Sequence, residues 1–206
     1  MPHELSSIGD QSIDTFRELG NIGAGNAATA LATILNVQIS MSVPEVAVVP
    51  FDHIINIMNG PENLVIGVLI NMSGDLNGYI LMILEMKDAL EMIAIALQKE
   101  KALEPEVILD EMDRSVLTEI ANILVGAYLS AIGAMTGLSA SPSVPVMAVD
   151  MVGAIMSIVL VEYGKIGDSV LFLKTKFSDV QKSMNGHFFL IPDFASYKIL
   201  MESLGL

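Results

Sequence analysis

The chain contains no cysteine, which excludes disulfide bonds, a thiol nucleophile and a zinc site built from thiolates. Its three histidines, His3, His53 and His187, are scattered and lack a metal-binding spacing such as HxxxH. We therefore expect no metal ion or other cofactor of the protein's own. The absence of cysteine is typical of a reducing compartment, and the N-terminus lacks the basic start and apolar run of a secretion signal. A cytoplasmic protein is expected.

Basic residues are also scarce. Ten lysines and arginines stand against 24 aspartates and glutamates, which gives a formal net charge of −14. Nucleic acid is excluded as a partner, because contacts to phosphate need a basic surface. The acidity is compatible with a cationic protein partner, and it is equally compatible with a role in solubility alone.

Charge is missing from the stretch 120–150 until its last residue, and the mean hydropathy of the chain is +0.60. A membrane-spanning helix needs about 20 predominantly apolar residues. Asn122, Tyr128, Ser130 and Thr136 interrupt the run, and Pro142 follows shortly after it. We expect a buried helix without membrane insertion, and a membrane-embedded helix is the alternative.

The chain does contain an internal duplication. A carboxylate and amide motif occurs twice at a constant offset of 101 residues. Its copies are Asp14, Glu18 and Asn21, and then Ser115, Glu119 and Asn122. Residues 14–45 align with residues 115–146 without a gap, and nine of the thirty-two pairs are identical, including a repeated Ser-Val-Pro. Duplication explains this agreement better than chance.

Each copy lies in a segment with helical periodicity, at about 12–35 and 113–136. Positions i, i+4 and i+7 of a helix fall within an arc of about 60°, so the three motif residues share one face. In the first segment, Phe16, Ala27, Leu31 and Ile34 fall on the opposite side. We expect that side to pack inward and the motif to face solvent.

A glycine follows each asparagine by one helical turn, namely Gly25 and Gly126. Glycine inside a helix costs about 1 kcal/mol relative to alanine. Its presence beside the amide in both copies predicts that a partner docks there and approaches the backbone closely.

The remaining segments predict an α+β protein. Residues 37–50, 63–71 and 77–85 are expected as strands, with a hairpin between the last two, followed by a helix at 86–99. Residues 144–153, 154–164 and 169–178 are expected as strands, and a last helix at about 194–204 follows residues 185–191. We interpret Lys99–Asp113 as a linker between repeats at approximately 10–98 and 111–206 of a single domain, 1–206. Related by a pseudo-twofold axis, the halves would share one antiparallel sheet covered by helices.

Several catalytic designs are excluded. The second copy carries a single carboxylate, Glu119, so the repeated motif supplies no pair of acids for glycosidase-like catalysis. No Ser-His-Asp set is present, and the glycine-rich residues 20–28 lie inside a predicted helix rather than in a loop that cradles phosphate.

The pattern [DS]xxxExxN, present twice, with "ELGNIGAGNAATAL" containing the first copy's glutamate and asparagine, resembles the CheC/CheX/FliY family of chemotaxis phosphatases. The resemblance covers essentially the whole chain, and the two motifs resemble the CheC type. It implies dephosphorylation of phospho-CheY. Glu18, Asn21, Glu119 and Asn122 would be catalytic: each amide would orient the attacking water, and each glutamate would pair with the regulator's lysine.

The same resemblance implies supporting roles for Asp14 and Ser115, and a Mg²⁺ ion held by the CheY substrate rather than by this chain. It also implies binding to the receptor deamidase CheD, for which the apolar stretch around Asp150 is a candidate surface. A non-catalytic adaptor that regulates CheD or CheY by binding alone is the competing interpretation. By itself the chain is expected to be a monomer.

Overall fold

A seven-stranded antiparallel sheet forms the centre of the computed structural model, which describes residues 10–50, 53–99, 108–163, 169–179 and 182–206. The strands lie in the order β1-β6-β7-β3-β2-β4, and β5 also pairs with β2. Their bounds are β1 Ser40–Pro50, β2 Leu64–Gly74, β3 Gly78–Glu85, β4 Ala140–Pro142, β5 Val146–Met151, β6 Ser169–Ser178 and β7 Ser183–Pro192. The predicted α+β architecture with one shared antiparallel sheet is confirmed.

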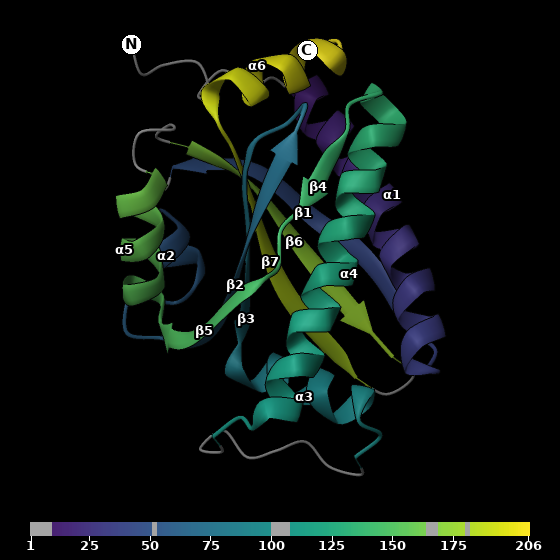
Figure 1. The fold of residues 1–206 in the computed structure, drawn as a ribbon, viewed down its shortest axis with the longest axis vertical. Helices are drawn as coiled ribbons and strands as arrows, with labels where there is room; N and C mark the ends of the chain where they lie inside the picture. The colour runs from purple at the N-terminus through teal and green to yellow at the C-terminus, as the bar shows by residue number, and fades with distance from the viewer. Residues whose placement is uncertain (1–9, 51–52, 100–107, 164–168, 180–181) are drawn as a thin grey trace.

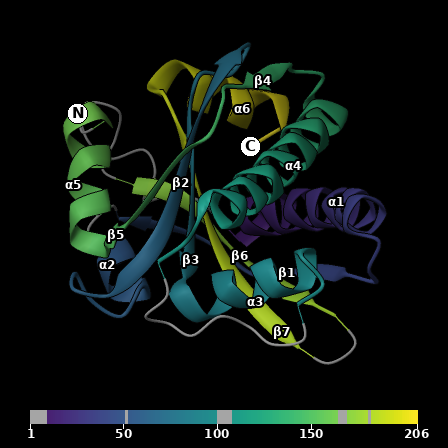
Figure 2. The same cartoon turned by 60° about the horizontal axis from the view of Figure 1, so that its bottom comes forward.

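Helices cover both faces of this sheet. They are α1 Asp10–Leu35, α2 His53–Ile57, α3 Met86–Ala96, α4 Glu111–Thr136, α5 Val152–Tyr163 and α6 Phe194–Ser203. The two long helices α1 and α4 lie side by side and run in opposite directions, as the colours of Figure 1 show, while α2 and α5 lie on the other side of the sheet. Figure 2 shows the same arrangement from below, with α3 beside the lower ends of α1 and α4.

The two halves of the chain interleave in the sheet. β1 of the first half pairs with β6 of the second, and β5 of the second half pairs with β2 of the first. The second strands of the two hairpins, β3 of β2–β3 and β7 of β6–β7, pair with each other at the centre of the sheet. Strands of each half therefore pair with strands of the other half. This pairing explains why the duplicated halves form one unit rather than two separate domains.

Two clusters of buried apolar side chains lie on opposite faces of the sheet. The larger cluster joins α1, α4 and α3 to the sheet, with Phe16, Leu117 and Phe188 among its members. The smaller one joins α2 and α5 to the other face, around Phe172 and Phe189. α4 is long and apolar enough to cross a membrane by length and composition, but half of its most apolar window is buried in the fold. The environment of these buried residues is that of a core helix.

The structure corrects several expectations. Residues 154–164 were expected as a strand, but Val152–Tyr163 forms α5, because a short apolar run rich in β-branched residues has no period that separates strand from helix. Ile34 was expected to pack inward and is 56% exposed. Helix α2 and strand β4 were not predicted. Of the predicted linker, residues 100–107 lie outside the described residues, and its end already belongs to α4, which begins at Glu111.

Candidate functional site

The first motif occupies the outer face of α1. Phe16, Ala27 and Leu31 are buried against the sheet and α4, each at most 2% exposed. Their burial turns the opposite face outward, where Asp14, Glu18 and Asn21 are exposed. Asp14 also accepts a hydrogen bond from Arg17 at 2.5 Å, in an ion pair that lies on the surface.

The second motif has the same placement on α4. Ser115, Glu119 and Asn122 are exposed, and the buried residues Leu117, Ile120 and Leu124 face the core. Each copy therefore presents an exposed glutamate and an exposed asparagine one helical turn apart. Within the described residues, the small apolar hollow between the ends of α1, α3 and α4 includes none of these side chains in its lining.

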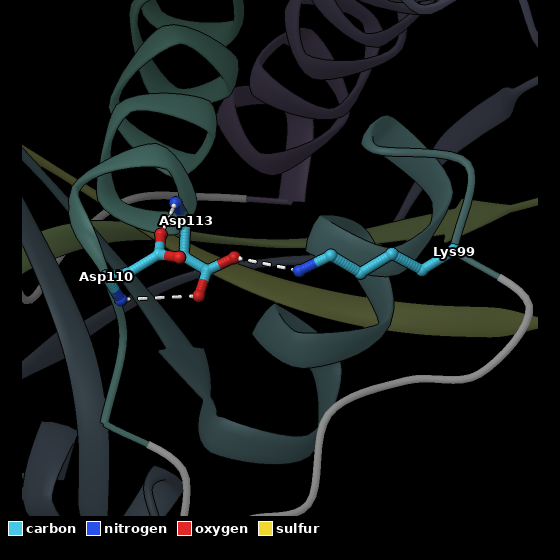
Figure 3. A network of polar contacts seen from close by, with 3 residues as sticks. All are labelled: Lys99, Asp110 and Asp113. Atoms are coloured by element: carbon cyan, nitrogen blue, oxygen red, sulfur yellow. Dashed lines mark hydrogen bonds and ion pairs between the residues drawn. The ribbon is translucent and has the colours of Figure 1, made fainter.

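A network of acidic residues fixes the start of α4 (Figure 3). The Asp110 carboxylate accepts a hydrogen bond from the N–H of Asp113 at 2.8 Å, and the Asp113 carboxylate accepts one from the N–H of Asp110 at 3.3 Å. Lys99, which follows α3, donates to Asp113 at 3.2 Å. This capping box satisfies N–H groups that the helix leaves unpaired and sets the direction of the turn that carries Ser115.

The spacing between α1 and α4 depends on a glycine and a tyrosine. Gly23 lies against Tyr128, and a Cβ added at Gly23 would come within 2.5 Å of Tyr128 Cδ1. The Tyr128 hydroxyl is hydrogen-bonded to that of Thr175 in β6 at 2.9 Å. Burial raises the pKa of Tyr128 to about 12, so this phenol keeps its proton at physiological pH. These contacts hold the two motif-bearing helices in a fixed relation to the sheet.

The two asparagines differ in their hydrogen bonding. Asn21 Oδ1 accepts a hydrogen bond from the backbone N–H of Val43 in β1 at 3.1 Å. The corresponding residues of the second half are Asn122 and Val144, and no hydrogen bond joins them. Val43 is 3% exposed, whereas Val144 is 83% exposed. The structure therefore breaks the symmetry of the duplication at the two amides.

The glycines predicted to receive a partner are open. A Cβ added at Gly25 or at Gly126 would have nothing within 4 Å. Neither glycine is required by packing inside this chain, in contrast to Gly23. This openness leaves room for an approaching backbone beside each asparagine.

The described residues contain no group of three or more histidine, aspartate or glutamate side chains that could hold a metal ion. What each motif offers is a carboxylate acceptor and an amide that both donates and accepts hydrogen bonds. A surface of this kind can complete a reaction site that a docked partner mostly supplies.

Sequence reasoning selected the motif residues but missed Val43, Tyr128 and Gly23. The signals were present: Ser-Val-Pro is itself repeated, and Gly23 aligns with the much larger Leu124. No pattern in the sequence shows that Val43 donates to Asn21, because that contact depends on how closely α1 approaches β1.

Together, the interleaved sheet and its two outward helices define a duplicated α+β protein with a repeated carboxylate and amide site. The model of the CheC-like family matches residues 12–48, and the model of the chemotaxis phosphatase CheX matches residues 66–156. CheY-P phosphatase CheC of Bacillus subtilis (strain 168) is 34% identical over 203 residues, which span 98% of this chain and 97% of that protein. The chain belongs to the CheC-like family, which confirms the family assigned from the motifs.

Two further relatives agree with this assignment. The flagellar motor switch phosphatase FliY of Bacillus subtilis (strain 168) is 27% identical over 125 residues, which span 60% of this chain and 32% of FliY. The crystal structure of Thermotoga maritima FliY matches with a TM-score of 0.77 at 18% identity, covering 97% of this chain and 98% of that one. At this identity the structural match shows a shared fold.

Proposed function

We propose that this protein hydrolyses the aspartyl phosphate of phospho-CheY. The observation that carries the proposal is the exposed glutamate and asparagine pair that each long helix presents one turn apart. The whole-length relative from Bacillus subtilis is a CheY-P phosphatase, which supports the same reaction here. Asn21 and Asn122 orient the attacking water, and Glu18 and Glu119 pair with the regulator's active-site lysine.

The chemistry needs little more than this from the chain. Phosphoryl transfer depends mainly on positioning and on neutralisation of charge, with few covalent steps for the protein to perform. In this proposal the Mg²⁺ and the acidic pocket belong to the phosphorylated regulator. A neutral amide can hold water beside the phosphoryl oxygens without the repulsion that a carboxylate would add.

Docking beside the asparagines uses the open helix surface at Gly25 and Gly126. Asp14 and Ser115 sit one turn before the glutamates and support them. In the first copy Asp14 is joined to Arg17, whereas Ser115 is a small neutral residue at the same place. The first site therefore has a cation, Arg17, next to Glu18 in the sequence. In the second half Arg114 precedes Ser115 and donates a hydrogen bond to the carbonyl of Leu109.

A second partner, CheD, is part of the proposal. The candidate surface lies around β5 and α5, where Val146, Met151 and Ile158 are 69%, 51% and 58% exposed. Asp150, the charged residue of this apolar stretch, is exposed among them. Helix α5 lies on the other side of the sheet from the motif helices (Figure 1), and β5 pairs with β2 within the sheet, so CheD and CheY would bind at separate places. We also propose that the protein acts in the cytoplasm and is a monomer by itself.

Phosphate release from phospho-CheY in the presence of Mg²⁺ tests the enzyme against the adaptor. The native chain is compared with Asn21→Ala/Asn122→Ala and with a control double variant, Asn26→Ala/Ser130→Ala, whose exposed residues lie on the same helices outside the motifs. We expect the control to match the native chain and the asparagine variant to lose release. If the native chain adds nothing to the regulator's own rate, even with CheD present, the adaptor is favoured.

A further inference from the structure

The two sites differ because β1 offers Asn21 a hydrogen-bond donor. The pairing of β1 with β6 passes from Ser42 opposite Lys176 to Glu45 opposite Lys174, which leaves Val43 and Pro44 together opposite Thr175. At such a bulge the extra residue is not paired in the ladder. The N–H of Val43 is donated to Asn21 Oδ1 instead.

Small residues in α1 allow this contact. A Cβ added at Gly20 would lie 3.2 Å from Val43 Cγ1 and 3.1 Å from Leu173 Cδ2, so the backbone of α1 is already tight against β1 and β6. The aligned residue in α4 is Ala121, which is fully buried. The second helix therefore carries a methyl group where α1 has none.

The second half also lacks the matching strand. Its copy of Ser-Val-Pro, Ser143–Pro145, falls between β4 and β5, so the strand is interrupted where β1 only bulges. Val144 points away from the core, and Ser143 is hydrogen-bonded to the backbone of Asn71. Asn122 consequently has no backbone donor like that of Val43.

The amide oxygen is the atom that matters for hydrolysis. A water that attacks phosphorus must direct a lone pair at it, so its hydrogens are best held by acceptors such as an amide oxygen. In the first site the N–H of Val43 takes one of the two acceptor positions of that oxygen and fixes the direction of the amide, so turning the amide toward a docked regulator breaks this bond. In the second site no such release is needed.

We infer that Val43 is a positioning residue whose N–H holds the Asn21 amide against β1, so that the first site works only after release and the second site carries most of the turnover. This inference rests on the proposed function. Since a neutral hydrogen bond contributes modestly, the first site alone is expected to show a kcat/KM roughly twofold to tenfold below that of the second.

The test measures kcat/KM for phospho-CheY with one site at a time. Asn122→Ala reports the first site and Asn21→Ala the second, with the first expected to be slower. In the Asn122→Ala background, Val43→Pro removes the N–H and should raise kcat/KM up to about tenfold. Val43→Ala keeps the N–H and trims the buried side chain, so it should give no increase. In the Asn21→Ala background, Val43→Pro should change nothing.

The inference is overturned if Asn21→Ala costs more activity than Asn122→Ala, or if Val43→Ala raises activity as much as Val43→Pro. Retention of full activity by the double asparagine variant would instead contradict the catalytic role of both asparagines, and a native chain that adds nothing to the regulator's own rate would remove the proposed function. If Val43→Pro does not fold, amide hydrogen exchange decides in the Asn122→Ala protein. Exchange at Val43 should accelerate on saturation with CheY activated by beryllofluoride, and unchanged protection contradicts the inference.

Discussion

Gly23 of α1 packs directly against Tyr128 of α4, with room for no side-chain atom between them. Gly23→Ala should therefore destabilise the protein by about 1 kcal/mol or more, because overpacking outweighs the better helix propensity of alanine. Gly25→Ala is the matched control, since a Cβ there has nothing within 4 Å and should add up to about 1 kcal/mol of stability. Urea unfolding of both variants measures the difference, and equal effects would refute the packing role of Gly23.

Substitution of Gly25 also distinguishes an effect on stability from an effect on docking. If a partner's backbone approaches α1 closely there, Gly25→Ala should weaken CheY binding while the fold becomes more stable. Gly126→Ala should act in the same way on the second helix, where the added Cβ also finds open space. Calorimetric titration with beryllofluoride-activated CheY measures the dissociation constant. Unchanged binding in the double glycine variant would remove both residues from the docking surface.

The asparagines should differ in stability as well as in activity. Asn21→Ala leaves the Val43 N–H without its partner, whereas Asn122→Ala removes no hydrogen bond within the described chain. Both changes gain about 0.5 kcal/mol of helix propensity. We therefore expect Asn21→Ala to be less stable than Asn122→Ala by about 1 kcal/mol in chemical unfolding. Equal stabilities would show that the Val43 contact contributes nothing.

Asp88 predicts a pH dependence of stability. Burial raises the pKa of this carboxyl, although a hydrogen bond from the N–H of Asn185 and the charge of Lys87 act in the opposite direction. The folded protein therefore holds the proton more tightly than the unfolded chain, and stability falls as the pH rises from about 3.8 through the folded-state pKa. Asp88→Asn keeps an acceptor for Asn185 and should gain most, relative to the native chain, at neutral pH.

Asp75 provides a control of opposite sign. Hydrogen bonds from the backbone N–H and the hydroxyl of Ser139 lower the pKa of its carboxyl. The stability that this carboxylate contributes is present above the unfolded-state pKa of 3.8 and is lost as the pH falls through the folded-state value. Asp75→Asn should therefore lose stability at neutral pH, with a smaller difference in acid. Unfolding curves at several pH values that shift both variants in the same direction would contradict this assignment.

Residue periodicity predicted the main features of this fold, because α1 and α4 carry long amphipathic patterns and the hairpin of β2 and β3 has a glycine-containing turn. It failed at α5, where Ile155, Val159 and their neighbours are apolar on every side and give no period. The positions of the motif side chains followed from helical geometry alone. The difference between the two sites could not be predicted from the sequence, because it depends on how closely Gly20 packs against Val43.

A single-turnover experiment tests the central claim most directly. Labelled phospho-CheY is mixed with saturating native protein or with Asn21→Ala/Asn122→Ala, and binding is measured in parallel. We predict that the double variant still binds the activated regulator while the phosphate decays at the regulator's own rate, and that the native chain accelerates the decay. Accelerated decay by a bound double variant would contradict the assignment of the two amides as the groups that position the attacking water.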